Sequence, residues 1–137
     1  VPAPGPEATL ASAAFAGRRI LVVDDEADVR LGTETLIASW GSRCVSAASV
    51  EEALERIGGT PPDAMIVDWR LAAGATGEDA VARLREAFGA AIPALIVSGA
   101  SAPGDLNRIK ATGMPLLHKP VAPAKLRSAL AFALGAR

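Results

Sequence analysis

Short apolar runs recur along this chain, and most of them stop at a polar residue. The clearest is Ala64–Val67, which ends at Asp68. A continuous run of this length is typical of a strand buried on both faces, as in a parallel sheet. Four further strands are predicted, at residues 20–23, 43–47, 93–97 and 115–117. Asp68 is therefore expected at the carboxyl end of a central strand, the edge where ligands bind in open α/β sheets.

Between the predicted strands, apolar residues recur at helical spacing. Five helices are predicted, at residues 27–40, 50–57, 76–88, 103–111 and 122–134. Ser49 and Glu52 have the spacing of a capping box at the start of the second helix. Strand and helix alternate five times, which predicts an α/β fold. We expect a five-stranded parallel sheet with helices on both faces and right-handed crossovers.

The composition indicates one ordinary domain preceded by a linker. Half of the 137 residues are apolar, enough for one well-filled core. The first six residues are rich in proline and are typical of a stiff linker. We therefore expect a linker over residues 1–16 and a single domain over residues 17–137. The chain opens on Val1 instead of Met, which suggests a fragment of a longer protein.

Charge and cysteine content exclude several classes of partner and setting. The 14 basic and 15 acidic residues give a net charge of −1, so no nucleic acid is expected as a partner. One cysteine, Cys44, cannot form an internal disulfide, which fits a reducing, cytoplasmic compartment. No apolar run approaches the roughly 18 residues of a membrane span. We expect no membrane contact by this fragment.

Four of the five predicted strands end in a polar residue. These residues are Asp24 and Asp25, Asp68, Ser98 and Lys119. The carboxyl ends of parallel strands share one edge, so the side chains are expected to converge. Each pair of carboxylates at about 4 Å repels by about 4 kcal/mol at an effective dielectric near 20. Such a cluster needs a raised pKa or a cation, and oxygen donors alone suit Mg²⁺ or Mn²⁺.

Together these side chains supply every group that phosphoryl transfer to a carboxylate requires. An aspartate beside a divalent cation can attack phosphorus and form an aspartyl phosphate. The Lys119 ammonium can pair with the phosphoryl oxygens, and the Ser98 hydroxyl can hydrogen-bond another of them. The residues therefore predict Asp68 as an acceptor of a phosphoryl group.

At this point the chain resembles bacterial receiver domains of two-component signalling. The resemblance covers about residues 18 to 134, and its motifs are ILVVDDE at 20–26, MIVDWR at 65–70, LIVSG at 95–99 and HKP at 118–120. It implies a flavodoxin-like (βα)5 fold with strand order 2-1-3-4-5. The run at 118–123 is most like the carboxyl-terminal receiver of a hybrid sensor histidine kinase, whose parent chain can be membrane-anchored.

The resemblance also implies a role for each site residue. Asp68 would be the phospho-acceptor, and Ser98 and Lys119 would bind the phosphoryl group. The implied ligands of Mg²⁺ are Asp24 through water, Asp25, Asp68 and the backbone carbonyl of Arg70. The Lys119–Pro120 bond is expected to be cis. In one respect the chain departs from the family, because Leu116 occupies the place of the aromatic residue that usually acts with Ser98 as a switch.

The implied function is a receiver that takes a phosphoryl group from a histidine kinase or a histidine-phosphotransfer domain. Such a receiver turns over no external substrate, so it is not expected to be an enzyme on its own; dimerisation is left open. The first alternative is an aspartate-based phosphatase of the haloacid-dehalogenase type. That chemistry wants a second acid two residues after Asp68, where this chain has Arg70. The second alternative is a docking module that is never phosphorylated, whose signature would be a lost acid or lysine.

Overall fold

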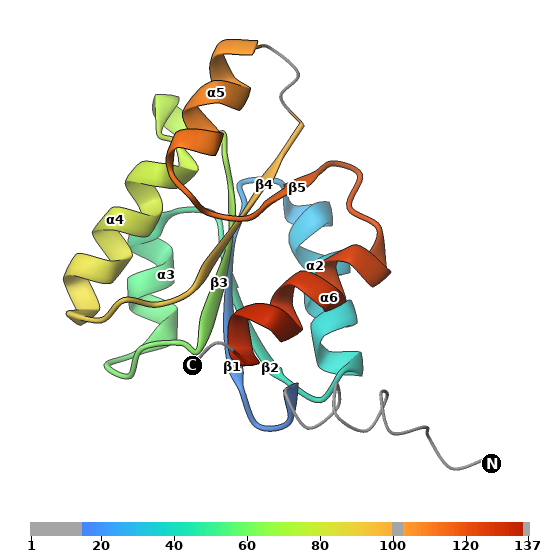
Figure 1. Ribbon diagram of the computed structural model, residues 1–137. Coiled ribbons are helices and arrows are strands. Elements are labelled where there is room, and N and C mark those ends of the chain that lie inside the picture. Colours follow the sequence, from blue (N-terminus) through green and yellow to red (C-terminus); the bar gives the residue numbers. More distant parts are fainter. Residues whose placement is uncertain (1–14, 100–102, 136–137) are drawn as a thin grey trace.

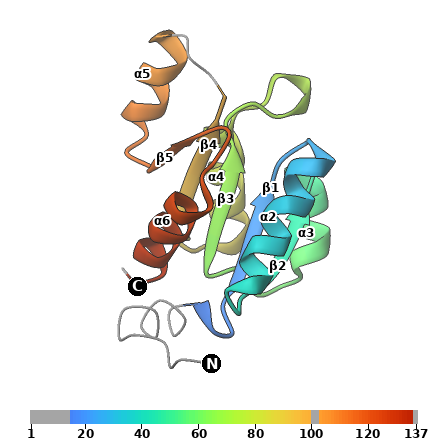
Figure 2. The same cartoon turned by 90° about the vertical axis from the view of Figure 1, so that its right-hand side faces the viewer.

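The computed structural model describes residues 15–99 and 103–135, and it contains one five-stranded parallel sheet (Figures 1 and 2). The strands are β1 (Arg19–Val23), β2 (Arg43–Ala47), β3 (Ala64–Asp68), β4 (Ala94–Ser98) and β5 (Leu116–His118). Their order is β2-β1-β3-β4-β5, which confirms the predicted topology. Strand β3 is therefore central, and Asp68 is its last residue.

Helices cover both faces of the sheet, as predicted (Figure 1). They are α2 (Ala27–Ser39), α3 (Val50–Ile57), α4 (Gly77–Phe88), α5 (Pro103–Ala111) and α6 (Pro123–Gly135), with a short 3₁₀ turn η1 (Ala72–Gly74) after β3. Helices α2 and α6 pack on one face, while α3, α4 and α5 lie on the other. The predicted strands and helices agree with these bounds to within one residue at each end.

Side chains of β3 alternate between two hydrophobic cores, one on each face of the sheet. Met65 and Val67 lie in the core beneath α3, α4 and α5. Ala64 and Ile66 lie in the core beneath α2 and α6. All five residues of β3 are buried because both faces are covered, which explains why the strand has no polar residue before Asp68.

The core beneath α2 and α6 also includes Phe15, a residue of the predicted linker. Its side chain is fully buried, and its ring centroid lies 5.2 Å from that of Trp40. The guanidinium of Arg127 on α6 lies over the same ring at 6.0 Å. At least this residue of the range 1–16 therefore contributes to the packed core. The other residues of the predicted linker, apart from Ala16, lie outside the described part of the chain.

Two helix starts near the site have their backbone N–H groups capped by side chains. Ser49 accepts from the Glu52 N–H as predicted, but the Glu52 carboxylate accepts from the Ala48 N–H instead of from Ser49, so the reciprocal half of the box is shifted. Thr76 and Asp79 form a complete capping box at the start of α4. This cap holds the first turn of α4 directly behind the end of β3.

Candidate functional site

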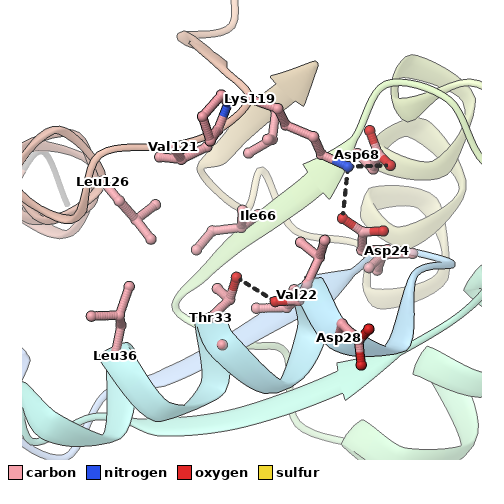
Figure 3. Close-up of a pocket in the computed structure, with 15 residues that line it drawn as sticks. Val22, Asp24, Asp28, Thr33, Leu36, Ile66, Asp68, Lys119, Val121 and Leu126 are labelled. Atoms are coloured by element: carbon pink, nitrogen blue, oxygen red, sulfur yellow. Dashed lines mark hydrogen bonds and ion pairs between the residues drawn. The ribbon is translucent and has the colours of Figure 1, made fainter. Parts of the chain in front are cut away.

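Side chains at the end of strand β3 and directly after strands β1 and β5 meet at the carboxyl edge of the sheet (Figure 3). The Lys119 Nζ atom lies 3.0 Å from Asp68 Oδ2 and 3.2 Å from Asp24 Oδ2. Asp24 and Asp68 are 4% and 6% exposed, so both carboxylates are buried, while Lys119 is partly exposed. The ammonium of Lys119 thus lies between two carboxylates that are 44 positions apart along the chain.

The loop after β1 is folded by hydrogen bonds to Asp24. The Asp24 N–H donates to the Ala47 carbonyl at 3.0 Å, which continues the pairing of β1 with β2. The Asp24 carboxylate accepts from the Glu26 N–H at 2.9 Å, and the Arg30 guanidinium donates to the Asp24 carbonyl at 2.7 Å. These bonds fix the carboxylate at the start of α2.

Four carboxylates lie close enough together to share one cation. Asp24, Asp25, Glu26 and Asp68 each offer an oxygen within 4.8 Å of the others. Asp25 and Glu26 are exposed, so the cluster opens to solvent on one side. Because all these donors are oxygens, the set fits Mg²⁺ or Mn²⁺ better than zinc.

The electrostatics of the site follow from burial and from these neighbours. Burial raises the pKa of the Asp68 carboxyl above its usual range, and the negative charge of Asp24 adds to the rise. Hydrogen bonds from Lys119 and from the Arg70 N–H lower this pKa without cancelling the increase. Burial alone would lower the pKa of Lys119, but its bonds and charge interactions with Asp68 and Asp24 raise it. Lys119 therefore stays protonated, whereas its surroundings disfavour the ionised form of Asp68.

The remaining predicted site residues lie on the strands and loop around Asp68. Ser98 ends β4, is 1% exposed, and its carbonyl accepts from the Lys119 N–H at 2.9 Å. Arg70 follows Asp68 by two residues and pairs with Thr76 in an isolated bridge. Leu116 is half-buried on β5 and packs against the core beneath α3, α4 and α5. The predicted switch position is thus filled by an aliphatic side chain.

A groove of about 500 Å³ runs from the site between α2 and α6 (Figure 3). Its polar end carries Asp24, Asp28, Asp68 and Lys119. Its apolar part includes Ile66 on the sheet, Leu36 on α2 and Leu126 on α6. Gly32 on α2 lines the groove without a side chain, which is one reason why the two helices leave this space between them.

Three features of the site were not predicted from the sequence. Glu26 lies near Lys119, with Oε1 3.5 Å from Nζ. Arg70 forms an ion pair with Asp105 on α5, at 2.5 Å. The first residue of α4, Gly77, lies so close to β3 that a Cβ atom there would be 2.8 Å from the Asp68 carbonyl oxygen. Run and spacing patterns describe single elements, so they carried no signal for these contacts between elements.

Comparisons with known proteins agree with this arrangement of fold and site. Residues 20–131 match the family model for the response regulator receiver domain. The response regulator protein PilR of Pseudomonas aeruginosa is 32% identical over 120 residues, which is 88% of this chain. The chain spans only 27% of the length of that relative.

Solved structures give the same picture. The chemotaxis protein CheY4 of Vibrio cholerae has a TM-score of 0.73 at 26% identity, covering 86% of this chain and 99% of that one. A receiver domain protein of Methanospirillum hungatei has a TM-score of 0.75 at 20% identity, covering 88% and 96%, and at that identity it supports the fold alone. No helix among the described residues is long and apolar enough to span a membrane. Because residues 20–131 match its family model, the chain belongs to the response regulator receiver domain family, whose members are signalling modules of two-component systems.

Proposed function

We propose that this chain accepts a phosphoryl group on Asp68 from a phosphohistidine of a kinase or a histidine-phosphotransfer domain. The observation that carries the proposal is the contact of Lys119 with both Asp68 and Asp24 at an opening lined by four carboxylates. The lysine supplies a fixed positive charge beside the acceptor oxygen. Side chains at such positions can neutralise the charge of an incoming phosphoryl group.

In the proposed reaction, one carboxylate oxygen of Asp68 forms a bond to phosphorus. The bond from phosphorus to the donor imidazole nitrogen breaks, and its electron pair stays on that nitrogen. Lys119 pairs with the phosphoryl oxygens, and the Ser98 hydroxyl donates to another of them. The ligands proposed for Mg²⁺ are Asp24 through water, Asp25, Asp68 and the carbonyl of Arg70; the bound cation would screen the negative charges that meet during transfer.

The proposed role also bears on the partners and the parent of this chain. A phospho-accepting receiver turns over no external substrate, so its output passes through contacts with other proteins. The receiver of a hybrid sensor histidine kinase is the parent we favour, because the run at 118–123 resembles that group. A cytoplasmic position follows from this phosphorelay role.

The direct test is phosphorylation by acetyl phosphate with Mg²⁺, followed by intact mass measurement. We expect one added phosphoryl group on the wild-type chain and none on Asp68→Asn. Glu55→Gln is the matched control, because Glu55 is an exposed acid on α3, remote from the site, and this variant should be phosphorylated normally. Equal phosphorylation of Asp68→Asn and the wild type would contradict the proposal.

The two alternative functions predict different results in the same assay. A phosphatase would release phosphate from a phosphomonoester through many turnovers, but the position of its second acid is held by Arg70, whose guanidinium is paired with Asp105. A docking module that is never phosphorylated would gain no mass. All the acids and the lysine of the proposed site are present, which favours the phospho-accepting function.

A further inference from the structure

Helix α5 is fastened to the two residues that directly follow Asp68. The Arg70 guanidinium pairs with the Asp105 carboxylate at 2.5 Å. The Arg108 guanidinium carbon lies 5.5 Å from the ring centroid of Trp69, in a cation–π contact. Trp69 itself is buried, with 1% of its surface exposed. The chain segment that carries the acceptor carboxylate therefore also carries the anchors of α5.

These anchors matter because α5 has little other burial. Among its residues only Ile109 is buried. Asp105, Arg108 and Ile109 are spaced by three and four residues, so they lie on one face of the helix. That face is the one turned to the loop after β3 and to the core. Loss of the ion pair would remove a contact that joins the first turn of α5 to the loop after β3.

Arg70 has contacts in both directions. Its backbone N–H donates to the Asp68 carboxylate, which lowers the pKa of that group. Its side chain is 73% exposed while that of Asp105 is 18% exposed, so solvent reaches the ion pair from the arginine side. Exposed ion pairs contribute only about 0 to 1 kcal/mol, so a stronger anion nearby can displace Asp105.

We propose that the Arg70 guanidinium is a further phosphoryl-binding group, which leaves Asp105 when Asp68 is phosphorylated and so releases the first turn of α5. This inference rests on the proposed function. A phosphoryl group on Asp68 brings a charge of about −1.5 to −2 and three acceptor oxygens, two residues from Arg70, whereas Asp105 offers a single negative charge. The planar guanidinium matches phosphoryl oxygens in a two-point contact. The state of Asp68 thus reaches α5 without an aromatic residue at position 116.

The test is amide hydrogen exchange of residues 103–111, with and without phosphorylation by acetyl phosphate and Mg²⁺, with intact mass as a parallel readout. In the wild type we expect phosphorylation to speed exchange in the first turns of α5 about fivefold, the effect of losing one ion pair at the upper end of the range for exposed pairs. Asp105→Asn should exchange at the fast rate before phosphorylation, change little afterwards, and still gain one phosphoryl group. Arg70→Gln should show the same fast exchange with no phosphate dependence.

The control is Arg83→Gln, which removes another arginine–carboxylate ion pair, at 2.8 Å between Arg83 on α4 and Glu51 on α3. This variant should keep the wild-type response of α5. A phosphorylated wild type with unchanged α5 exchange overturns the inference and leaves the proposed function standing. A phosphate-dependent increase that persists in Arg70→Gln also overturns it. If no phosphoryl group is gained, the proposed function fails and the inference falls with it.

Discussion

At the scale of single residues, the surroundings of Asp68 lower the stability of the fold when its carboxyl group is ionised. The carboxyl is 6% exposed and faces the charge of Asp24, which together raise its pKa despite the bond from Lys119. A carboxyl whose pKa is higher in the folded than in the unfolded state stabilises the fold at low pH, and this contribution is lost as the pH rises through the folded pKa. At neutral pH the ionised Asp68 is therefore a destabilising group.

We expect Asp68→Asn to raise the free energy of unfolding by about 1 kcal/mol at pH 7 without divalent cations, since the burial of the charged carboxylate and its repulsion by Asp24 together outweigh its attraction to Lys119. The amide oxygen can still accept from Lys119. The advantage should shrink as the pH falls through the carboxyl range, because the wild-type Asp68 becomes protonated. Urea denaturation across a pH series measures this, with Glu55→Gln as the control. A variant less stable than the wild type at every pH would mean that the attraction of Lys119 outweighs desolvation.

Divalent cations should reverse this penalty at the same residues. A ligand that binds only the folded state adds about 2.7 kcal/mol of stability at a hundred times its dissociation constant. We expect MgCl₂ to raise the unfolding temperature of the wild type, and to raise it much less in Asp25→Asn. Asp25 is exposed, so its amide variant should fold normally without the cation. A thermal unfolding series against NaCl at matched ionic strength provides the check, and equal shifts in both proteins would argue against Asp25 as a ligand.

The sequence predicted the residues at strand ends better than it predicted their partners. Asp24, Asp68 and Lys119 could be grouped in advance because the carboxyl ends of parallel strands share one edge, and the contacts of Lys119 show them together. The pairing of Arg70 with Asp105 could not be predicted. It depends on where α5 packs beside the loop after β3, and no local pattern of apolar residues encodes that position.

At the scale of elements, helix and strand bounds were predictable because the residues that start or stop an element agree with the apolar periodicity along this chain. These residues are glycines, prolines and helix caps. Strands β4 and β5 each lie one residue later than predicted, since Ser98 and His118 pair with each other at the end of the sheet. The spacing of Ser49 and Glu52 gave the start of α3 correctly. It could not predict that the Glu52 carboxylate bonds to Ala48, which depends on side-chain reach.

The close approach of α4 to β3 predicts opposite effects on stability when either of two helical glycines, Gly77 or Gly32, is replaced by alanine. A Cβ at Gly77 would lie 2.8 Å from the Asp68 carbonyl oxygen and 3.1 Å from Ile96 Cδ1, so Gly77→Ala must shift the end of β3. We expect this variant to lose about 1 to 3 kcal/mol of stability, as overpacked sites do, and to be phosphorylated more slowly. Denaturation and the acetyl phosphate assay measure the two effects.

Gly32→Ala is the matched control on α2. No atom lies within 4 Å of a Cβ built at Gly32, which lines the open groove beside the site. Here the same substitution should stabilise the chain by about 0.5 to 1 kcal/mol, because alanine favours a helix interior over glycine. If both variants changed stability in the same direction, the close approach of α4 to β3 would not be the cause.

At the scale of the whole molecule, alternation of strands and helices predicted the layered α/β architecture, but the strand order came only with the family resemblance. Periodicity shows that a strand is buried on both faces without showing which strands flank it. The extent of the folded unit was harder still. Phe15 was assigned to the linker because the residues before it are rich in proline and alanine, yet its ring packs on Trp40.

This packing predicts that the stable unit begins before residue 17. Phe15→Ala should cost about 3 kcal/mol, as truncation of a buried aromatic side chain does, and a chain shortened to begin at residue 17 should lose at least as much. Phe132→Ala is the control, because Phe132 is 75% exposed and its loss should stay within about 0.5 kcal/mol. Urea denaturation of the three variants beside the full chain provides the comparison. If the chain beginning at residue 17 were as stable as the full one, Phe15 would add nothing to the stability of the core, and the predicted domain start at residue 17 would hold. If its stability falls with that of Phe15→Ala, the segment entering the receiver is part of the core that supports α2 and α6.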